Sequence, residues 1–412
     1  MVTSFLLQIS IILAMAVIFG RVVQKMGQPS IVGELLAGIV LGPTILKNAS
    51  PIIFEKIFVN NIAVSSELNC FMQFGMILFM FVSGLKIDTR YILGRKKMVL
   101  FTSLSGMVIP LLLGISTVSF LPALLNAPAD NSHGVYALFV GIALSISALP
   151  VIIKTLTDLN LAESEIGTII IGSATIDDIA GWTMFSCLLN VSVLNGSILS
   201  INIAILKLLL FIVILFTAGV RMCRAVFSFI GSHVQNPAVN LSVIIIMLTL
   251  TAAIAESIGI HPFFAAFLLG IALKKDFDSR AMLYDTRKIM HMIATSFFAP
   301  LYFVSVGMKV NVIHDFNLIL VLIVLLIAFI GKIIGSSTGA LIGGAGRKDA
   351  LVIGVCMNSR GSIEIIVASA AVEANMIGQQ MYVALLIMAL ITSLFCGPVV
   401  KQMLHGSKRA GI

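Results

Sequence analysis

Two adjacent aspartates, Asp177 and Asp178, lie in the middle of an apolar stretch, IGSATIDDIAGW. Neighbouring residues on a helix point about 100° apart, so the two carboxylates cannot share one partner. One can face a cation on another helix while the other faces an opening. Carboxylate oxygens can replace part of the hydration shell of an alkali cation, and burial disfavours their charged form, so protons compete for them. Such a site is sufficient to exchange a monovalent cation for protons.

Three further charged side chains, Lys332, Arg360 and Glu364, also lie within apolar stretches, where each needs a partner. Lys332 has no acidic residue within one helical turn, so its partner must come from another helix, and Asp177 is the first candidate. A purely structural buried ion pair is the alternative. Arg360 and Glu364 stand four residues apart and predict a structural ion pair along one helix face.

The elements that carry these residues are predicted to be membrane helices. The chain has 412 residues, of which 59% are hydrophobic and 11% charged, with a mean hydropathy of +1.11. This composition excludes a soluble globular protein, and continuous apolar runs of about 18 residues or more predict spanning helices rather than barrel strands. We therefore expect an all-α polytopic membrane protein with about thirteen transmembrane helices, at 3–22, 29–46, 68–85, 98–122, 134–154, 163–193, 200–222, 238–257, 260–274, 290–308, 317–343, 349–372 and 379–404.

Basic residues between these spans predict the orientation. Under this count, one side of the membrane carries most of them, namely Arg21, Lys25, Lys86, Arg90, Arg95, Lys96, Lys97, Arg221, Arg224, Lys274, Lys275, Arg280, Arg287, Lys288, Arg347, Lys348, Lys401, Lys408 and Arg409. The positive-inside rule then places the N-terminus outside and the C-terminus in the cytoplasm of a cell inner (plasma) membrane. The formal net charge of +8 reports this orientation, and no nucleic-acid partner is expected.

Thirteen spans divide as six, one and six, which predicts an inverted repeat. The fifth span of each half is interrupted, reading GIALSISALPVII in the first half and VCMNSRGSIEII in the second. Broken helices expose backbone carbonyls and helix ends near the bilayer middle, beside a cavity that uses them. Side chains expected to support these two breaks are Ser145, Ser147, Asn358 and Ser359.

Seven phrases resemble, in order, a known family. They are PSIVGELLAGIVLGPTIL, LFMFVSGLKIDTR, ALSISALPVIIKTLTDL, ATIDDIAGW, ESIGIHPFFAAFLLGIAL, FFAPLYFVSVGMKVN and NSRGSIEIIVASA. The family is the monovalent cation:proton antiporter-2 group, which includes NapA-like and NhaA-like sodium/proton antiporters and the membrane domains of Kef-type potassium/proton antiporters. The resemblance covers nearly the whole chain.

The resemblance implies a homodimer whose protomers work by alternating access. Its domains would be dimerisation-domain helices 1–3 at 1–97, core-domain helices 4–6 at 98–193, a linker helix at 200–230, dimerisation-domain helices 8–10 at 238–308 and core-domain helices 11–13 at 317–404. The two broken helices would cross beside the aspartates in the core. The chain stops at Ile412, shortly after its last span, so we expect no C-terminal nucleotide-binding regulatory domain.

The resemblance also implies the roles at the site. Asp178 would carry the cation and protons in turn, and Asp177 would form an ion pair with Lys332 that breaks when the cation enters. An Asp–Asp pair with this lysine resembles electrogenic members, which implies two protons per cation. The substrates would be Na⁺, Li⁺ or K⁺ and H⁺, with no cofactor and no enzymatic activity.

Several alternatives stay open at this point. A sodium-coupled symporter of an organic solute shares the inverted repeat, and a Kef-like potassium efflux pathway shares the phrase NSRGSIEI. A channel needs a filter-like motif that is absent from the sequence. An intramembrane aspartyl protease needs facing aspartates, and adjacent ones cannot face each other.

Overall fold

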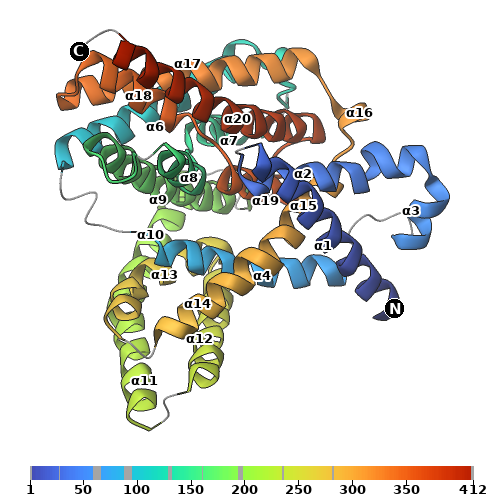
Figure 1. The fold of residues 1–412 in the computed structure, drawn as a ribbon, viewed down its shortest axis with the longest axis vertical. Helices are drawn as coiled ribbons and strands as arrows, with labels where there is room; N and C mark the ends of the chain where they lie inside the picture. The colour runs from blue at the N-terminus through green and yellow to red at the C-terminus, as the bar shows by residue number, and fades with distance from the viewer. Residues whose placement is uncertain are drawn as a thin grey trace. The chain divides into compact units, whose positions relative to one another are not determined.

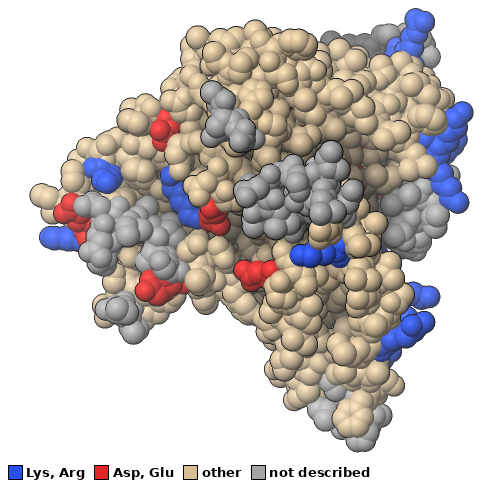
Figure 2. All heavy atoms as spheres, turned by 180° about the vertical axis from the view of Figure 1, so that it is seen from behind, with Lys and Arg blue, Asp and Glu red and all other residues tan. Residues whose placement is uncertain are grey.

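The structure is a computed structural model that describes residues 2–26, 28–58, 66–87, 95–128, 132–159, 161–193, 198–233, 236–280 and 283–409. Arg90, one of the basic residues used above for orientation, lies outside these ranges. Every regular element within them is a helix, as predicted (Figure 1). On the face drawn in Figure 2, acidic and basic side chains are sparse, which suits a surface that faces lipid.

The helices run in chain order as α1 (Val2–Lys25), α2 (Ser30–Leu41), η1 (Pro43–Lys47), α3 (Pro51–Ile57), α4 (Ser66–Leu85), α6 (Lys96–Phe120), η3 (Pro122–Leu125), α7 (His133–Ser145), α8 (Leu149–Asp158), α9 (Glu165–Val193), α10 (Ile198–Ile214), η4 (Leu215–Gly219), α11 (Val220–His233), α12 (Pro237–Ser257), α13 (Pro262–Ser279), α14 (Tyr284–Ile293), η6 (Ala294–Phe298), α15 (Ala299–Met308), α16 (Val312–Asp315), α17 (Leu318–Gly343), α18 (Arg347–Met357), α19 (Ser362–Glu373) and α20 (Gln379–Arg409).

Within the described ranges, nine helices are long and apolar enough to cross a membrane. Four of the thirteen predicted spans are not among the nine, namely 134–154, 163–193, 260–274 and 349–372. The first and last of these are each divided into two short helices, α7 with α8 and α18 with α19. The second carries the aspartate pair, and the third ends in a charged segment. The count of thirteen stays a prediction.

The chain forms two compact units. Unit 1 comprises residues 1–22, 33–87 and 189–309, and unit 2 comprises residues 23–32, 88–188 and 310–412. In unit 1, α4 packs against α13 at a close crossing of glycines. A Cβ at Gly270 would overlap the carbonyl oxygen of Phe81, so this crossing requires glycine.

Unit 2 contains the aspartate pair and all the other predicted site residues. Its longest packed seam joins α6 and α17, while α18 and α20 also lie against α17 (Figure 1). Helix α17 begins where the Asn317 side chain accepts a hydrogen bond from the Leu320 N–H. It ends at Gly343, and the next residue, Gly344, has a φ of 103° that favours glycine. The packing of α17 against α6 therefore fixes the position of Lys332 within unit 2.

Both predicted helix breaks are present in unit 2. Helix α7 ends at Ser145 and α8 begins at Leu149, with extended backbone at Ile146 and Ala148. Proline suits the first turn of α8 because its missing N–H has no helical partner there. The backbone N–H of Ala148 donates to the carbonyl oxygen of Ser359 at 2.9 Å. The two breaks therefore contact each other directly.

Candidate ion-binding site

Asp177 and Asp178 lie near the middle of α9 and are fully buried, with exposed fractions of 0% and 1%. Burying two adjacent carboxylates in a membrane helix is unfavourable unless each has a specific partner or a function. The partners of the two side chains differ completely. The pair is therefore asymmetric, as expected from their different directions on the helix.

Asp177 accepts hydrogen bonds from three other segments of unit 2. Ser103 of α6 donates to its Oδ1 at 2.6 Å, while Ser147 of the first break donates to its Oδ2 at 2.9 Å. The Lys332 Nζ of α17 lies 2.6 Å from the same Oδ2, and both charged side chains are 0% exposed. This buried, charge-assisted contact joins α9 to α17, as the lysine's isolation in the sequence suggested.

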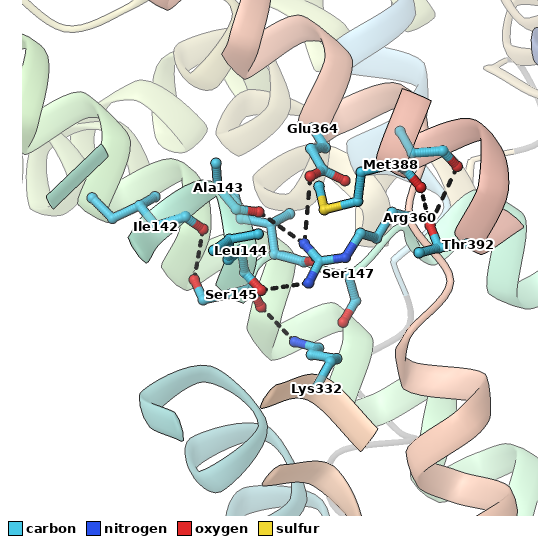
Figure 3. Close-up of polar contacts among 12 residues, drawn as sticks. Ile142, Ala143, Leu144, Ser145, Ser147, Lys332, Arg360, Glu364, Met388 and Thr392 are labelled. Carbon is cyan, nitrogen blue, oxygen red and sulfur yellow. Dashed lines mark hydrogen bonds and ion pairs between the residues drawn. The ribbon is translucent and has the colours of Figure 1, made fainter. Parts of the chain in front are cut away.

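Lys332 has a second partner in the backbone. Its Nζ also donates to the carbonyl oxygen of Ser145, the last residue of α7 (Figure 3). Because the last carbonyls of a helix have no intrahelical partner and carry its negative dipole end, a cation is stabilised there. Lys332 thus holds both Asp177 and the end of the broken helix.

Asp178 has fewer hydrogen-bond partners than Asp177. Its carboxylate accepts a hydrogen bond from the backbone N–H of Leu149, the first residue of α8. Its Oδ1 is buried and has no hydrogen-bond partner in the part of the chain that the structure describes. A carboxylate oxygen so placed beside a helix N-terminus can accept a proton or bind a cation.

Arg360 caps the end of α7 from the opposite half of the chain. Its guanidinium donates to the carbonyl oxygens of Ala143 at 2.9 Å and Leu144 at 2.5 Å (Figure 3). It also donates to the carbonyl oxygen of Ile146 at 3.4 Å. Its contact with Glu364, predicted from their spacing, is also present, with Arg360 Nη1 3.4 Å from Glu364 Oε1. The guanidinium therefore binds mainly the carbonyl oxygens at the end of α7, and its contact with Glu364 is longer than its two shortest contacts with carbonyl oxygens.

The other residues predicted at the breaks are also buried in unit 2. Ser145 donates its hydroxyl to the Ile142 carbonyl oxygen at 2.7 Å, so its backbone oxygen, not its side chain, faces Lys332. Asn358 and Ser359 are 3% and 0% exposed, and Ser359 contributes its carbonyl oxygen to the contact between the breaks.

Two features of the site were not anticipated from the sequence. Ser103 lies 74 positions before Asp177, and the carbonyls held by Arg360 lie 214 to 217 positions before it. The only signal in the sequence was the group of three small polar residues in LFTSLSG, since such residues are common in packed membrane helices.

The charges in the centre of unit 2 do not balance. Three buried carboxylates, Asp177, Asp178 and Glu364, face two buried cations, Lys332 and Arg360. With all five ionised, these side chains carry a net charge of −1. One monovalent cation or one proton neutralises it. Among the described residues no group of three or more His, Cys, Asp and Glu side chains could hold a metal ion.

Comparison with known proteins identifies the family to which this chain belongs. The sequence profile of the transmembrane sodium/hydrogen exchanger family matches residues 11–406. The chain belongs to the sodium/hydrogen exchanger family. It is a multi-pass membrane protein, and its relatives are transporters rather than enzymes.

The relatives of this chain are named as antiporters of Na⁺, of K⁺ or of both. It is 28% identical over 401 residues to the Na⁺/H⁺ antiporter NhaS4 of Synechocystis, covering 96% of each chain. It is 26% identical over 408 residues to the Na⁺/H⁺-K⁺ antiporter GerN of Bacillus cereus, covering 99% of this chain and 98% of GerN. It is 27% identical over 432 residues to K⁺/H⁺ antiporter 1 of Saccharomyces cerevisiae, covering all of this chain but 47% of the yeast protein.

This chain spans about half the length of the yeast relative and of the plant cation/H⁺ antiporters it matches. Among solved structures it is similar to the sodium proton antiporter MjNhaP1 from Methanocaldococcus jannaschii at pH 8, with a TM-score of 0.63 and 14% identity, covering 96% of this chain and 97% of that one. At this identity the likeness shows the fold alone.

Proposed function

We propose that this chain exchanges a monovalent cation for protons by alternating access, with cation and protons competing at Asp178. The observation that carries the proposal is the buried Asp178 Oδ1, which lacks a protein partner among the described residues, on a carboxylate that contacts the start of α8. The surplus of one negative charge in the centre of unit 2 supports the same proposal.

Asp177 and Lys332 have a separate role in this proposal. Their contact holds Lys332 on the Ser145 carbonyl oxygen in the cation-free state. Arrival of the cation breaks this contact, which changes the charge at the end of α7. The resemblance of the Asp–Asp pair to electrogenic members implies two protons for each cation, of which Asp178 would hold one and the Asp177–Lys332 pair the other.

The wider architecture belongs to the proposal as well. Thirteen spans in a six, one and six inverted repeat would place the N-terminus outside and the C-terminus in the cytoplasm of the inner membrane. Unit 2 would be the moving, ion-carrying part of each protomer, and unit 1 would form the homodimer. The names of NhaS4, GerN and the yeast antiporter support Na⁺ and K⁺ as candidate substrates.

The experiment is a proteoliposome assay with an imposed pH gradient, in which Na⁺, Li⁺ or K⁺ is added and proton movement is followed by fluorescence dequenching. We expect a cation-evoked signal that ranks the ions and that Asp178→Asn abolishes. Glu165→Gln is a matched control, because Glu165 lies on the same helix but is exposed and pairs with Arg95. If wild type gave no signal with any of the three ions, exchange would be excluded and solute symport would be tested next. If Asp178→Asn gave the wild-type signal, Asp178 would not be the site that cation and protons share.

A further inference from the structure

The hydroxyl of Ser147 is shared between two acceptors on different elements. Its Oγ lies 2.9 Å from Asp177 Oδ2 and also 2.9 Å from the carbonyl oxygen of Met357. A serine hydroxyl has one hydrogen, so it can be donated fully to only one of the two. Ser147 is 0% exposed. At any moment, its hydroxyl hydrogen can therefore be donated either to Asp177 or to the Met357 carbonyl oxygen at the second helix break.

The two acceptors have different needs. Asp177 already accepts hydrogen bonds from Lys332 Nζ and Ser103 Oγ, each at 2.6 Å. Met357 is the last residue of α18, so its carbonyl oxygen faces the break instead of a following turn of helix. While Lys332 is in place, Met357 gains more from the Ser147 hydrogen than Asp177 does. Once Lys332 leaves, Asp177 becomes the acceptor that needs it more.

We propose that Ser147 is a positioning residue that donates to Met357 in the cation-free state and to Asp177 in the cation-loaded state. The inference rests on the proposed exchange of the contact between Asp177 and Lys332. It adds a consequence for the second half of the chain, because the end of α18 loses a donor in the same step that loads the site. Cation loading is thereby linked to both helix breaks through one hydroxyl group.

The first test compares Ser147→Ala and Ser147→Thr in the proteoliposome assay. Without the hydroxyl, Asp177 has one charged-group hydrogen bond fewer in the loaded state, so we expect the apparent KM for the cation to rise roughly tenfold. Ser147→Thr keeps a hydroxyl and should restore the KM to within about twofold of wild type. The matched control is Ser305→Ala, a buried serine of unit 1 whose hydroxyl donates to the Tyr302 carbonyl oxygen on its own helix.

The second test separates this role from a merely structural one. Cation binding by the purified full chain is measured as cation-dependent thermal stabilisation, with and without Lys332→Ala. With Lys332 present, Ser147→Ala should weaken binding about tenfold. With Lys332 removed, Asp177 needs Ser147 in both states, so the same change should weaken binding less than about twofold. Lys332→Gln replaces Lys332→Ala if the alanine variant does not purify.

Equal losses in the two backgrounds would show that Ser147 is a fixed structural donor and would overturn the inference. An unchanged KM in Ser147→Ala, in a protein whose exchange is abolished by Asp178→Asn, would overturn it while leaving the proposed function intact. Absence of exchange in wild type would instead overturn the proposed function itself.

Discussion

At the scale of single residues, we expect the buried contact between Lys332 and Asp177 to be costly to break. Both side chains are fully buried, so removing one leaves the other as an uncompensated charge. Lys332→Ala should therefore lower the free energy of unfolding by about 3–5 kcal/mol. Denaturant or thermal unfolding of the detergent-solubilised protein measures this loss.

The control for this prediction removes both charges. Asp177→Leu combined with Lys332→Met replaces the pair by apolar side chains, which is often neutral for stability. We expect the double variant to recover most of the loss while remaining unable to exchange ions. A double variant no more stable than Lys332→Ala would show that the loss comes from packing rather than from the unpaired charge.

A second residue-scale prediction concerns Arg360. Lysine carries the same charge but lacks the planar fork that reaches three carbonyl oxygens at once. Arg360→Lys should therefore cost about 2 kcal/mol or more of stability, because buried carbonyls lose their donors. Glu364→Gln should cost less, since Glu364 contacts Arg360 only at 3.4 Å. A larger effect for Glu364→Gln would restore their ion pair as the main role of Arg360.

Sequence reasoning located the charged residues but not all of their partners. Asp177 could be assigned to Lys332 because an isolated buried lysine demands an acid, and few acids lie in the apolar runs. The partners of Arg360 are backbone carbonyls of α7, and every residue has a carbonyl, so no residue type marks them. The i,i+4 spacing predicted the contact with Glu364, which is present, but it gave no sign of the contacts with these carbonyls.

At the scale of elements, the position of Lys332 depends on the seam between α6 and α17. A Cβ at Gly339 would overlap the backbone of Phe101, so Gly339→Ala must push the two helices apart. We expect a loss of about 1–3 kcal/mol in unfolding free energy and reduced exchange, because Lys332 lies two turns away on the same helix. Unfolding and the proteoliposome assay measure the two effects.

Gly134→Ala is the matched control for this seam. Gly134 lies in α7, and a Cβ added there would have no neighbouring atom within 4 Å, so alanine should be tolerated or slightly stabilising. If Gly339→Ala were as harmless as Gly134→Ala, close packing of glycine would not be what fixes α17 against α6.

The helix breaks could be predicted because their causes are local. Small polar residues, Pro150 and Gly361 interrupt two apolar runs at the positions where α7 and α18 end. Hydropathy cannot tell a broken span from a continuous one, which accounts for two of the four predicted spans that are not among the nine spanning helices of the described ranges. The other two are continuous helices, one with the aspartate pair and one with a charged end. The contact between the breaks joins residues more than two hundred positions apart, and no local pattern shows it.

At the scale of the whole molecule, competition between cation and protons predicts how exchange depends on pH. If both bind Asp178, lowering the pH raises the apparent KM for the cation, by up to about tenfold per pH unit for each competing proton. Saturating cation should restore the maximal rate. Rates measured over a matrix of pH and cation concentration test this, and a maximal rate that falls with pH at constant KM would contradict competition.

The most direct test of the central claim is to add Na⁺ or K⁺ to purified protein in weakly buffered solution and measure released protons. Competition at Asp178 predicts that the cation acidifies the solution in proportion to the protein, and that Asp178→Asn abolishes the release while Glu165→Gln preserves it. A wild-type protein that binds the cation without releasing protons, or an Asp178→Asn variant that releases as many, would contradict the assignment of Asp178 as the shared site.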